Sequence, residues 1–226
     1  MKIHAFADDA KLSAAVAEAV IETVAGPYKD PTAIMLAGGS TPLAAYSIVA
    51  QARRRIDPKL TVFFSDDRHV PPWDEKSNFG NIVPHLHRCG ILDNYVLRVH
   101  GELPLEAAVN DYEKQLDGFF KRNGKIALGL LGLGTDGHTA SLFNADDIKR
   151  GTNALAVGVQ RPDGLQGISV TPSVLARVER LLIVISGAGK KAMAQTLINS
   201  PETIAAGLAV KGHPNVELWT DEAAKP

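Results

Sequence analysis

The chain has 226 residues, of which 45% are hydrophobic, and a formal net charge of -1. Its length favours one domain over residues 1–226, and its charge balance gives no basic surface for nucleic acid or an anionic membrane. No apolar run approaches about 20 residues, so we expect no membrane span. The single cysteine, Cys89, excludes a disulfide framework. Without a basic and then apolar leader at its N-terminus, the protein is expected in the cytoplasm.

Strand and helix patterns alternate along the chain. Short apolar runs predict strands over residues 2–6, 33–37, 60–64, 126–131, 154–159, 168–170, 181–185 and 216–219. Capping residues and helical spacing predict helices from Asp8 or Asp9 to Gly26, from Ser40 or Thr41 to about Arg54, from Ser77 through Leu86, from Leu103 to Lys121, and through Met193 to Ile198. This alternation favours a mostly parallel sheet with helices on both faces.

Four of these strands end in clusters of glycine and polar residues. The clusters are Gly38 to Thr41, Asp66 to Arg68, Gly132 to His138, and Gly187 to Lys190. The carboxyl ends of parallel strands meet at one edge of a sheet, which is where ligands bind in open α/β folds. The sequence therefore predicts that all four clusters converge on one site.

The first cluster has the features of an anion-binding turn. Gly38 and Gly39 let backbone N–H groups approach a ligand closely, and a helix N-terminus follows them. Ser40 and Thr41 add hydroxyl donors, and Lys190 could reach the same anion. The alternative is an ordinary strand-to-helix turn with a good helix cap.

The second and third clusters carry groups suited to proton transfer. Asp66 could orient a hydroxyl or accept a proton, and Arg68 could bind a phosphate bidentately. His138 follows Asp136 by two residues in a glycine turn, so the carboxylate could orient an imidazole that takes a proton from water. The alternatives are a surface ion-pair cluster and a structural histidine.

Two cofactor hypotheses fail on context. Residues 132–137 match the dinucleotide pattern G-x-G-x-x-G, but no long helix follows, and the next strand ends at Gln160, where that pattern needs an acidic ribose ligand. His85, His87 and Cys89 lie close together without the spacing of a zinc site. We expect neither cofactor nor metal. Trp73, Ser77 and Asn78 could form a lid beside the site.

Together these motifs identify a family. They are Gly38-Gly39-Ser40-Thr41-Pro42, Asp66-Asp67-Arg68 with Ser77-Asn78, the stretch from Leu131 to Phe143, and Gly187 to Lys190. Over nearly its whole length the chain resembles the 6-phosphogluconolactonases. The related glucosamine-6-phosphate deaminases share the Asp-Gly-His core but continue with an Ile-Ala-Phe-Asn-Glu type sequence, whereas Thr139-Ala140-Ser141-Leu142-Phe143 favours the lactonase. The resemblance implies a Rossmann-like three-layer α/β/α fold, shared with these deaminases and with ribose-5-phosphate isomerase.

Three residues depart from the family pattern. Asp67 stands where the family usually has Glu, and Asn144 where it usually has Pro. Gly167 stands where an Arg commonly opens an Arg-x-Thr-x-Thr strand. If that Arg helps to hold phosphate elsewhere, another residue must replace it here, and Arg161 is the candidate.

The resemblance implies hydrolysis of 6-phospho-D-glucono-1,5-lactone to 6-phospho-D-gluconate, a step of the oxidative pentose phosphate pathway. The glycine turn with Arg68 and Lys190 would hold the phosphate, and His138 would activate water. Asp136 would orient His138, and Asp66 would bind sugar hydroxyls or assist proton transfer.

Other features of the expected enzyme follow from the same picture. Backbone N–H groups around Gly134 to Gly137 could stabilise the oxyanion. We expect a monomer or weak homodimer that acts on a small sugar-phosphate lactone. The alternatives are a sugar-phosphate isomerase or deaminase of the glucosamine-6-phosphate type, and a non-catalytic sugar-phosphate-binding protein.

Overall fold

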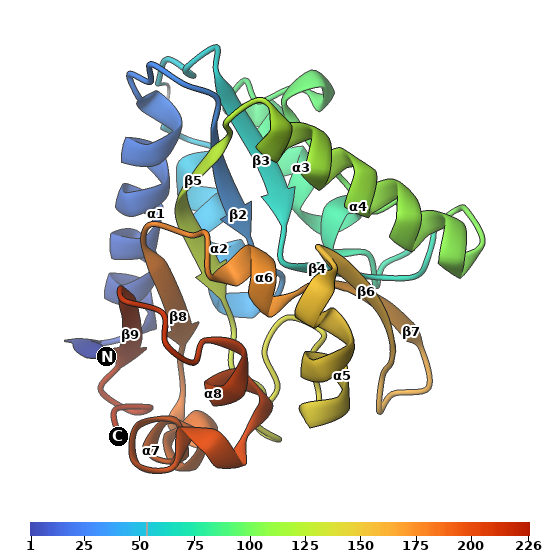
Figure 1. Cartoon of the computed structure of the whole chain (residues 1–226). Helices are drawn as coiled ribbons and strands as arrows, with labels where there is room; N and C mark the ends of the chain where they lie inside the picture. The colour runs from blue at the N-terminus through green and yellow to red at the C-terminus, as the bar shows by residue number, and fades with distance from the viewer. Residues whose placement is uncertain (53) are drawn as a thin grey trace.

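A six-stranded parallel sheet forms the centre of the molecule (Figure 1). The computed structural model describes residues 1–52 and 54–226. In spatial order the strands are β1 (Lys2–Phe6), β9 (Val216–Asp221), β8 (Leu181–Ile185), β5 (Lys125–Leu131), β2 (Thr32–Leu36) and β3 (Leu60–Phe64). Because every pairing in this sheet is parallel, the strand ends that carry the polar clusters share one edge.

Helices cover both faces of this sheet, as the alternation of elements predicts. One face packs against α1 (Asp9–Ala25), α2 (Ser40–Val49) and α3 (Asn78–Arg88). The other packs against α4 (Leu105–Lys121), α5 (Ala145–Arg150), α6 (Pro172–Leu175), α7 (Lys191–Asn199) and α8 (Ala205–Ala209). In β2, Ile34 packs on the side of α1 to α3 and Met35 on the side of α4 to α8, so the strand is buried along its whole length. The predicted three-layer fold is confirmed.

A second, antiparallel sheet was not predicted. Its strands are β4 (Asp66–Arg68), β7 (Gln166–Val170) and β6 (Ala156–Gln160), in that order. Only five residues, 161–165, connect β6 to β7, and so short a connection permits antiparallel pairing alone. Its turn includes Gly164 at φ +83°. The runs expected over 154–159 and 168–170 are therefore strands, but they lie outside the parallel sheet.

The second helix differs from its prediction at both ends. Gly39, with φ 105°, is the N-cap residue, so Ser40 and Thr41 occupy the first turn and neither caps it. The helix ends at Val49 rather than near Arg54, because the following N–H groups of Gln51 and Ala52 turn back to carbonyls three residues earlier. Position 53 lies outside the described residues. Elsewhere the expected caps are correct: Asp8 accepts a hydrogen bond from the N–H of Lys11, and Ser77 from that of Gly80.

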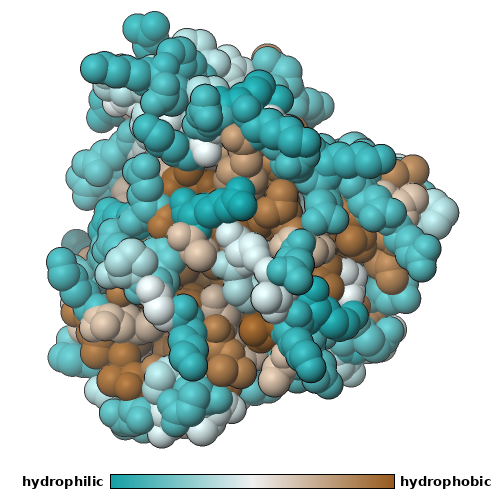
Figure 2. Space-filling model, viewed as in Figure 1, coloured by the Kyte–Doolittle hydropathy of each residue, from teal (hydrophilic) through white to brown (hydrophobic). Residues whose placement is uncertain are grey.

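Short elements complete the chain, and the surface between them is mixed. Single 3₁₀ turns cover Asp93–Tyr95, Gly151–Asn153, Ala188–Lys190 and Pro201–Thr203. Figure 2 shows hydrophilic residues over much of the visible surface, with hydrophobic residues gathered in the hollows between them. Among the described residues, no helix combines the length and apolar character needed to cross a membrane.

Candidate active site

The four polar clusters line one cleft of about 180 Å³ at the carboxyl edge of the parallel sheet. Its lining consists of Ala37, Gly38, Gly39, Ser65, Asp66, Arg68, Asn78, Gly132, Leu133, Gly134, His138, Ala140, Arg161 and Lys190. Three predicted site residues are not part of this lining. Ser40 and Thr41 belong to the first turn of α2, and Asp136 reaches the cleft through His138. The predicted convergence of the clusters is confirmed.

His138 and Asp136 form a hydrogen-bonded pair in the turn after β5. The Nδ1 atom of His138 lies 2.5 Å from Oδ1 of Asp136, which also accepts the backbone N–H of His138 at 3.2 Å. Burial raises the pKa of Asp136, but the hydrogen bonds from the His138 ring and backbone outweigh it and hold this pKa below its usual range. The imidazole packs on the Phe143 ring, with 4.5 Å between ring centroids. The pair is thus fixed in orientation, with Asp136 as the negative partner.

The backbone of this turn leaves no room for a side chain at Gly134. A Cβ atom there would lie 2.1 Å from the His138 ring and 2.3 Å from the Asp136 carboxylate. The N–H of Gly134 donates to the carbonyl of His138, and that of Gly137 donates to the carbonyl of Gly134. The N–H groups of Gly134 and Gly137 are therefore used to close the turn. The expectation that backbone N–H groups around Gly134 to Gly137 stabilise an oxyanion stays a prediction, and it now concerns the other N–H groups of this turn.

Asp66 occupies the opposite wall and is 6% exposed. Its Oδ1 accepts a hydrogen bond from Ser65 Oγ at 3.0 Å, and its Oδ2 accepts one from Ser141 Oγ at 2.6 Å. Ser141 lies 75 residues further along the chain. Asp66 is therefore a held carboxylate with a hydroxyl on each oxygen.

Asp67 has a structural role that its sequence position did not reveal. Its carboxylate accepts the N–H groups of Arg68, Asn78 and Phe79 and the hydroxyl of Ser77, so it joins β4 to the start of α3. Burial raises its pKa to about 6, against the lowering effect of the three backbone N–H groups. Asp67, at the position where the family usually has the longer Glu, thus hydrogen-bonds directly to the N-terminus of α3.

Arg68 and Asn78 bring the second cluster against the first. Arg68 Nη1 donates to Asn78 Oδ1 at 2.9 Å, and Asn78 Nδ2 donates to the carbonyl of Asp66 at 3.0 Å. A Cβ at Gly38 would lie 2.1 Å from that same Asn78 oxygen, so only glycine fits there. Asn78 is a fixed part of the cleft rather than part of a lid, whereas Trp73 is 81% exposed. Arg68 Nε is buried without a partner among the described residues.

Two positive ends complete the lining. The first N–H groups of α2 have no partner within the helix, and they start at Gly39, where the helix dipole is positive. Lys190 Nζ donates to the carbonyl of Leu133 at 2.7 Å, which fixes the ammonium beside the β5 turn. Behind it, the buried Asp221 accepts the N–H of Gly187 and the hydroxyl of Ser186. This arrangement suits an anionic ligand.

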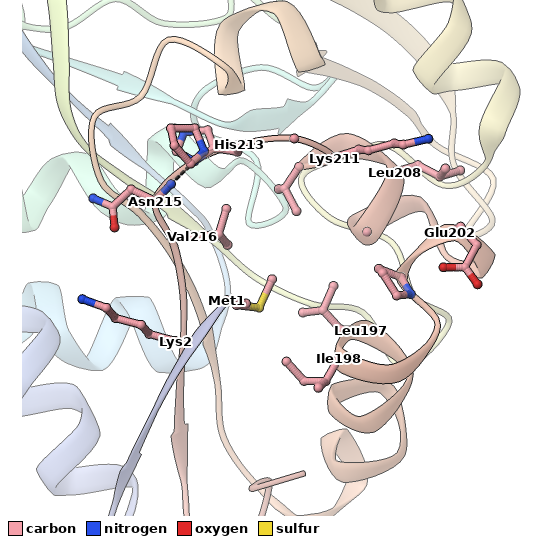
Figure 3. A pocket seen from close by; sticks show the side chains of 15 residues that line it. Met1, Lys2, Leu197, Ile198, Glu202, Leu208, Lys211, His213, Asn215 and Val216 are labelled. Carbon is pink, nitrogen blue, oxygen red and sulfur yellow. Dashed lines mark hydrogen bonds between the residues drawn. The ribbon is translucent and has the colours of Figure 1, made fainter.

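A larger cleft, of about 550 Å³, lies elsewhere and contains none of the four polar clusters (Figure 3). Its apolar side chains include Leu197, Ile198 and Val216. Both ring nitrogens of its histidine, His213, are engaged by backbone, at the carbonyl of Val178 and the N–H of Asn215. Among residues 1–52 and 54–226, no three His, Cys, Asp or Glu side chains are grouped to hold a metal.

Comparison with known proteins agrees with this fold and site. The chain belongs to the family of glucosamine-6-phosphate isomerases and 6-phosphogluconolactonases, whose model matches residues 7–218. It is similar to a 6-phosphogluconolactonase of Treponema pallidum, with 31% identity over 89% of this chain and 86% of that protein. A human 6-phosphogluconolactonase is 30% identical over 98% of this chain and 92% of its own. The crystal structure of 6-phosphogluconolactonase from Thermotoga maritima superposes with a TM-score of 0.82, at 26% identity, over 98% of this chain and 99% of that one.

Proposed function

We propose that this protein is a 6-phosphogluconolactonase, which hydrolyses 6-phospho-D-glucono-1,5-lactone to 6-phospho-D-gluconate in the cytoplasm, as a monomer or weak homodimer. The observation that carries the proposal is the His138–Asp136 pair, which faces a cleft lined by Arg68 and Lys190. An acid–base pair beside an anion-binding wall matches a substrate with an ester carbonyl at one end and a phosphate at the other. The names of the relatives support the same reaction.

The phosphate is held where positive groups meet. Arg68 lines the cleft with its guanidinium, and the N-terminus of α2 at Gly39 offers backbone N–H groups. Lys190 adds an ammonium on the side of the β5 turn. Binding of the phosphate in this way also positions the rest of the sugar. The lactone carbonyl is therefore placed near His138 without a strong binding group of its own.

His138 acts as the general base. With its Nδ1–H donated to Asp136, the ring presents the Nε2 lone pair for the proton of an attacking water. Asp136 then stabilises the imidazolium that forms. His138 then gives the proton to the ring oxygen of the lactone as the bond from that oxygen to the carbonyl carbon breaks. This step yields the free acid and a hydroxyl group. Asp66, held by Ser65 and Ser141, binds the sugar hydroxyls.

The test is a pair of assays on the purified protein. Freshly generated 6-phosphogluconolactone should disappear well above its spontaneous rate, followed by a pH-stat or through 6-phosphogluconate dehydrogenase. Glucosamine-6-phosphate should release no ammonia under the same conditions. Ammonia release without lactone hydrolysis would make the protein a deaminase, and binding of 6-phosphogluconate with neither activity would make it a sugar-phosphate-binding protein.

A further inference from the structure

Small residues of the neighbouring strand β7 lie beside Asp66 and Arg68. In the β4–β7 pairing, Asp66 lies opposite Ser169 and Arg68 opposite Gly167. Side chains directly opposite in an antiparallel pair share a face. A Cβ at Gly167 would therefore point along Arg68, and it would lie 3.0 Å from Ser141 Oγ and 3.2 Å from Arg161 Cδ. The missing side chain at 167 leaves the space that Arg161 crosses.

Arg161 reaches this space from the residue after β6, and its side chain is only 10% exposed. Its Nη1 donates to Ser141 Oγ at 2.9 Å, and Ser141 in turn donates to Asp66. Its guanidinium carbon lies 5.3 Å from the centroid of the Phe143 ring, the same ring on which His138 packs. Arg161 is thus part of the lining of the same cleft as His138, the proposed base.

The charge of Arg161 is balanced by Asp163 in the β6–β7 turn. Arg161 Nε lies 3.2 Å and Nη2 3.1 Å from Asp163 Oδ2. A guanidinium has five N–H groups, so these bonds and the one to Ser141 leave one N–H on each of Nη1 and Nη2 without a partner among the described residues. The hydrogen bonds from Arg161 hold the pKa of Asp163 below its usual range, and the positive charge of Arg68 acts in the same direction. The Asp163 carboxylate therefore lies near the positive charges of Arg161 and Arg68, and the Asp163 side chain is 49% exposed.

We propose that Arg161 binds the phosphate of the substrate together with Arg68, and that Asp163 is a built-in competitor which occupies Arg161 until the phosphate takes its place. The exchange keeps the number of hydrogen bonds to the guanidinium and replaces a singly charged carboxylate by a phosphate, so it favours the ligand. Asp163 sits on an exposed turn and can return to water once displaced. This inference rests on the proposed function only for the choice of ligand.

Calorimetric binding of 6-phosphogluconate and of inorganic phosphate tests the inference independently of turnover. Arg161→Met should weaken both ligands by roughly tenfold or more, because a charge-assisted hydrogen bond is lost. Asp163→Asn should instead tighten both by several-fold. Asp117→Asn is the charge-matched control, because Asp117 pairs with Lys121 on the surface of α4, and it should change neither.

The double variant Arg161→Met/Asp163→Asn separates competition from general repulsion. If Asp163 competes for Arg161, removing it has no further effect once Arg161 is absent, and the double variant binds like Arg161→Met. If the double variant still binds several-fold more tightly than Arg161→Met, Asp163 acts only as a nearby negative charge and the competition is refuted. Weaker binding by Asp163→Asn alone would show that Asp163 positions Arg161, which also refutes it.

Two further outcomes keep the inference distinct from the proposed function. Gluconate, which has the carboxylate but no phosphate, should bind Arg161→Met and the wild type equally; a loss confined to gluconate would assign Arg161 to the carboxylate and overturn the proposal. If the wild type hydrolyses no lactone yet the variants behave as expected toward inorganic phosphate, the function fails and the anion site stands. Wild-type protein that binds neither phosphate ligand would overturn the inference.

Discussion

The two walls of the cleft are built differently. The β5 wall presents His138 and Asp136, whose side chains are 29% and 51% exposed and joined mainly to each other. The β4 wall presents Asp66 and Asp67, which are 6% and 2% exposed and tied by hydrogen bonds to α3 and to Ser141. Replacing a residue of the β5 wall leaves few groups without hydrogen-bond partners. Replacing a residue of the β4 wall leaves buried donors without their acceptor. The first wall should therefore govern turnover, and the second both folding and binding.

His138→Ala should have the largest effect. Loss of a general base lowers kcat by about a hundredfold to ten-thousandfold, while the melting temperature and the Kd for 6-phosphogluconate stay close to wild type because the ring is part of the exposed pair. Steady-state kinetics and calorimetry measure both. His87→Ala is the matched control, since His87 forms an exposed pair with Asp93 outside the cleft. Unchanged kcat in His138→Ala would remove this residue from the mechanism.

Asp67→Ala should show the opposite behaviour. It leaves the N–H groups of Arg68, Asn78 and Phe79 without their acceptor, at a cost of about 3 kcal/mol of unfolding free energy. KM should also rise, because Arg68 loses its fixed partner Asn78. Urea denaturation measures the stability, and Asp74→Ala, on the exposed loop before α3, should cost about 1 kcal/mol or less. An Asp67→Ala protein of wild-type stability would contradict the view that this wall is structural.

The pH dependence of stability provides an independent check on Asp67. Burial raises its folded pKa to about 6, above the unfolded value of about 4. Between these values the folded state binds more protons than the unfolded state, so the contribution of this group to stability falls as pH rises from about 4 to 6. Denaturation curves over this range should show that decline in the wild type relative to Asp67→Asn, which cannot titrate. A parallel pH dependence in the two proteins would contradict the raised pKa.

The difference between the two walls also explains which parts of the site could be predicted from the sequence. The β5 wall is local: Asp136 and His138 lie two residues apart in a glycine turn, and their pairing follows from that spacing. The convergence of the four clusters also followed, because parallel strands place their carboxyl ends together. The network of the β4 wall joins Asp66 to Ser141 and Ser141 to Arg161, separations of 75 and 20 residues that leave no periodic signal.

Two further features depend on contacts that a pattern of residue types does not contain. The antiparallel sheet was missed because a three-residue strand such as β4 has no hydrophobic alternation of its own and exists through its pairing with β7. Ser40 and Thr41 were expected to cap α2, yet φ 105° at Gly39 lets the chain enter the helix one residue earlier. For the β4 wall, the sequence held one usable signal, which was Gly167. Because the family usually has an Arg at this position, its absence indicated Arg161 as a candidate replacement.

Gly38→Ala tests how closely the first cluster packs on the β4 wall. The added methyl would lie 2.1 Å from Asn78 Oδ1 and push Asn78 away from Arg68. Overpacking of this kind costs about 1–3 kcal/mol, and KM should rise several-fold while kcat changes little. Gly189→Ala is the control, because that position also lies at a strand–helix junction but has open space around it. If Gly38→Ala and Gly189→Ala had equal KM values, the contact with Asn78 would not position the phosphate.

Asp136→Asn asks whether the carboxylate of the exposed pair does more than hold the ring. Asn keeps an oxygen for the Nδ1–H of His138 but removes the negative charge that, in the proposed mechanism, stabilises the imidazolium. We expect kcat to fall by roughly tenfold, less than for His138→Ala, since the base itself remains. Half-exposure limits the stability change to about 0.5 kcal/mol, and Asp93→Asn, in the exposed pair outside the cleft, should leave kcat unchanged. If Asp136→Asn lost as much activity as His138→Ala, the carboxylate would be indispensable for the proton transfer; equal activity to wild type would reduce Asp136 to a structural contact of the turn.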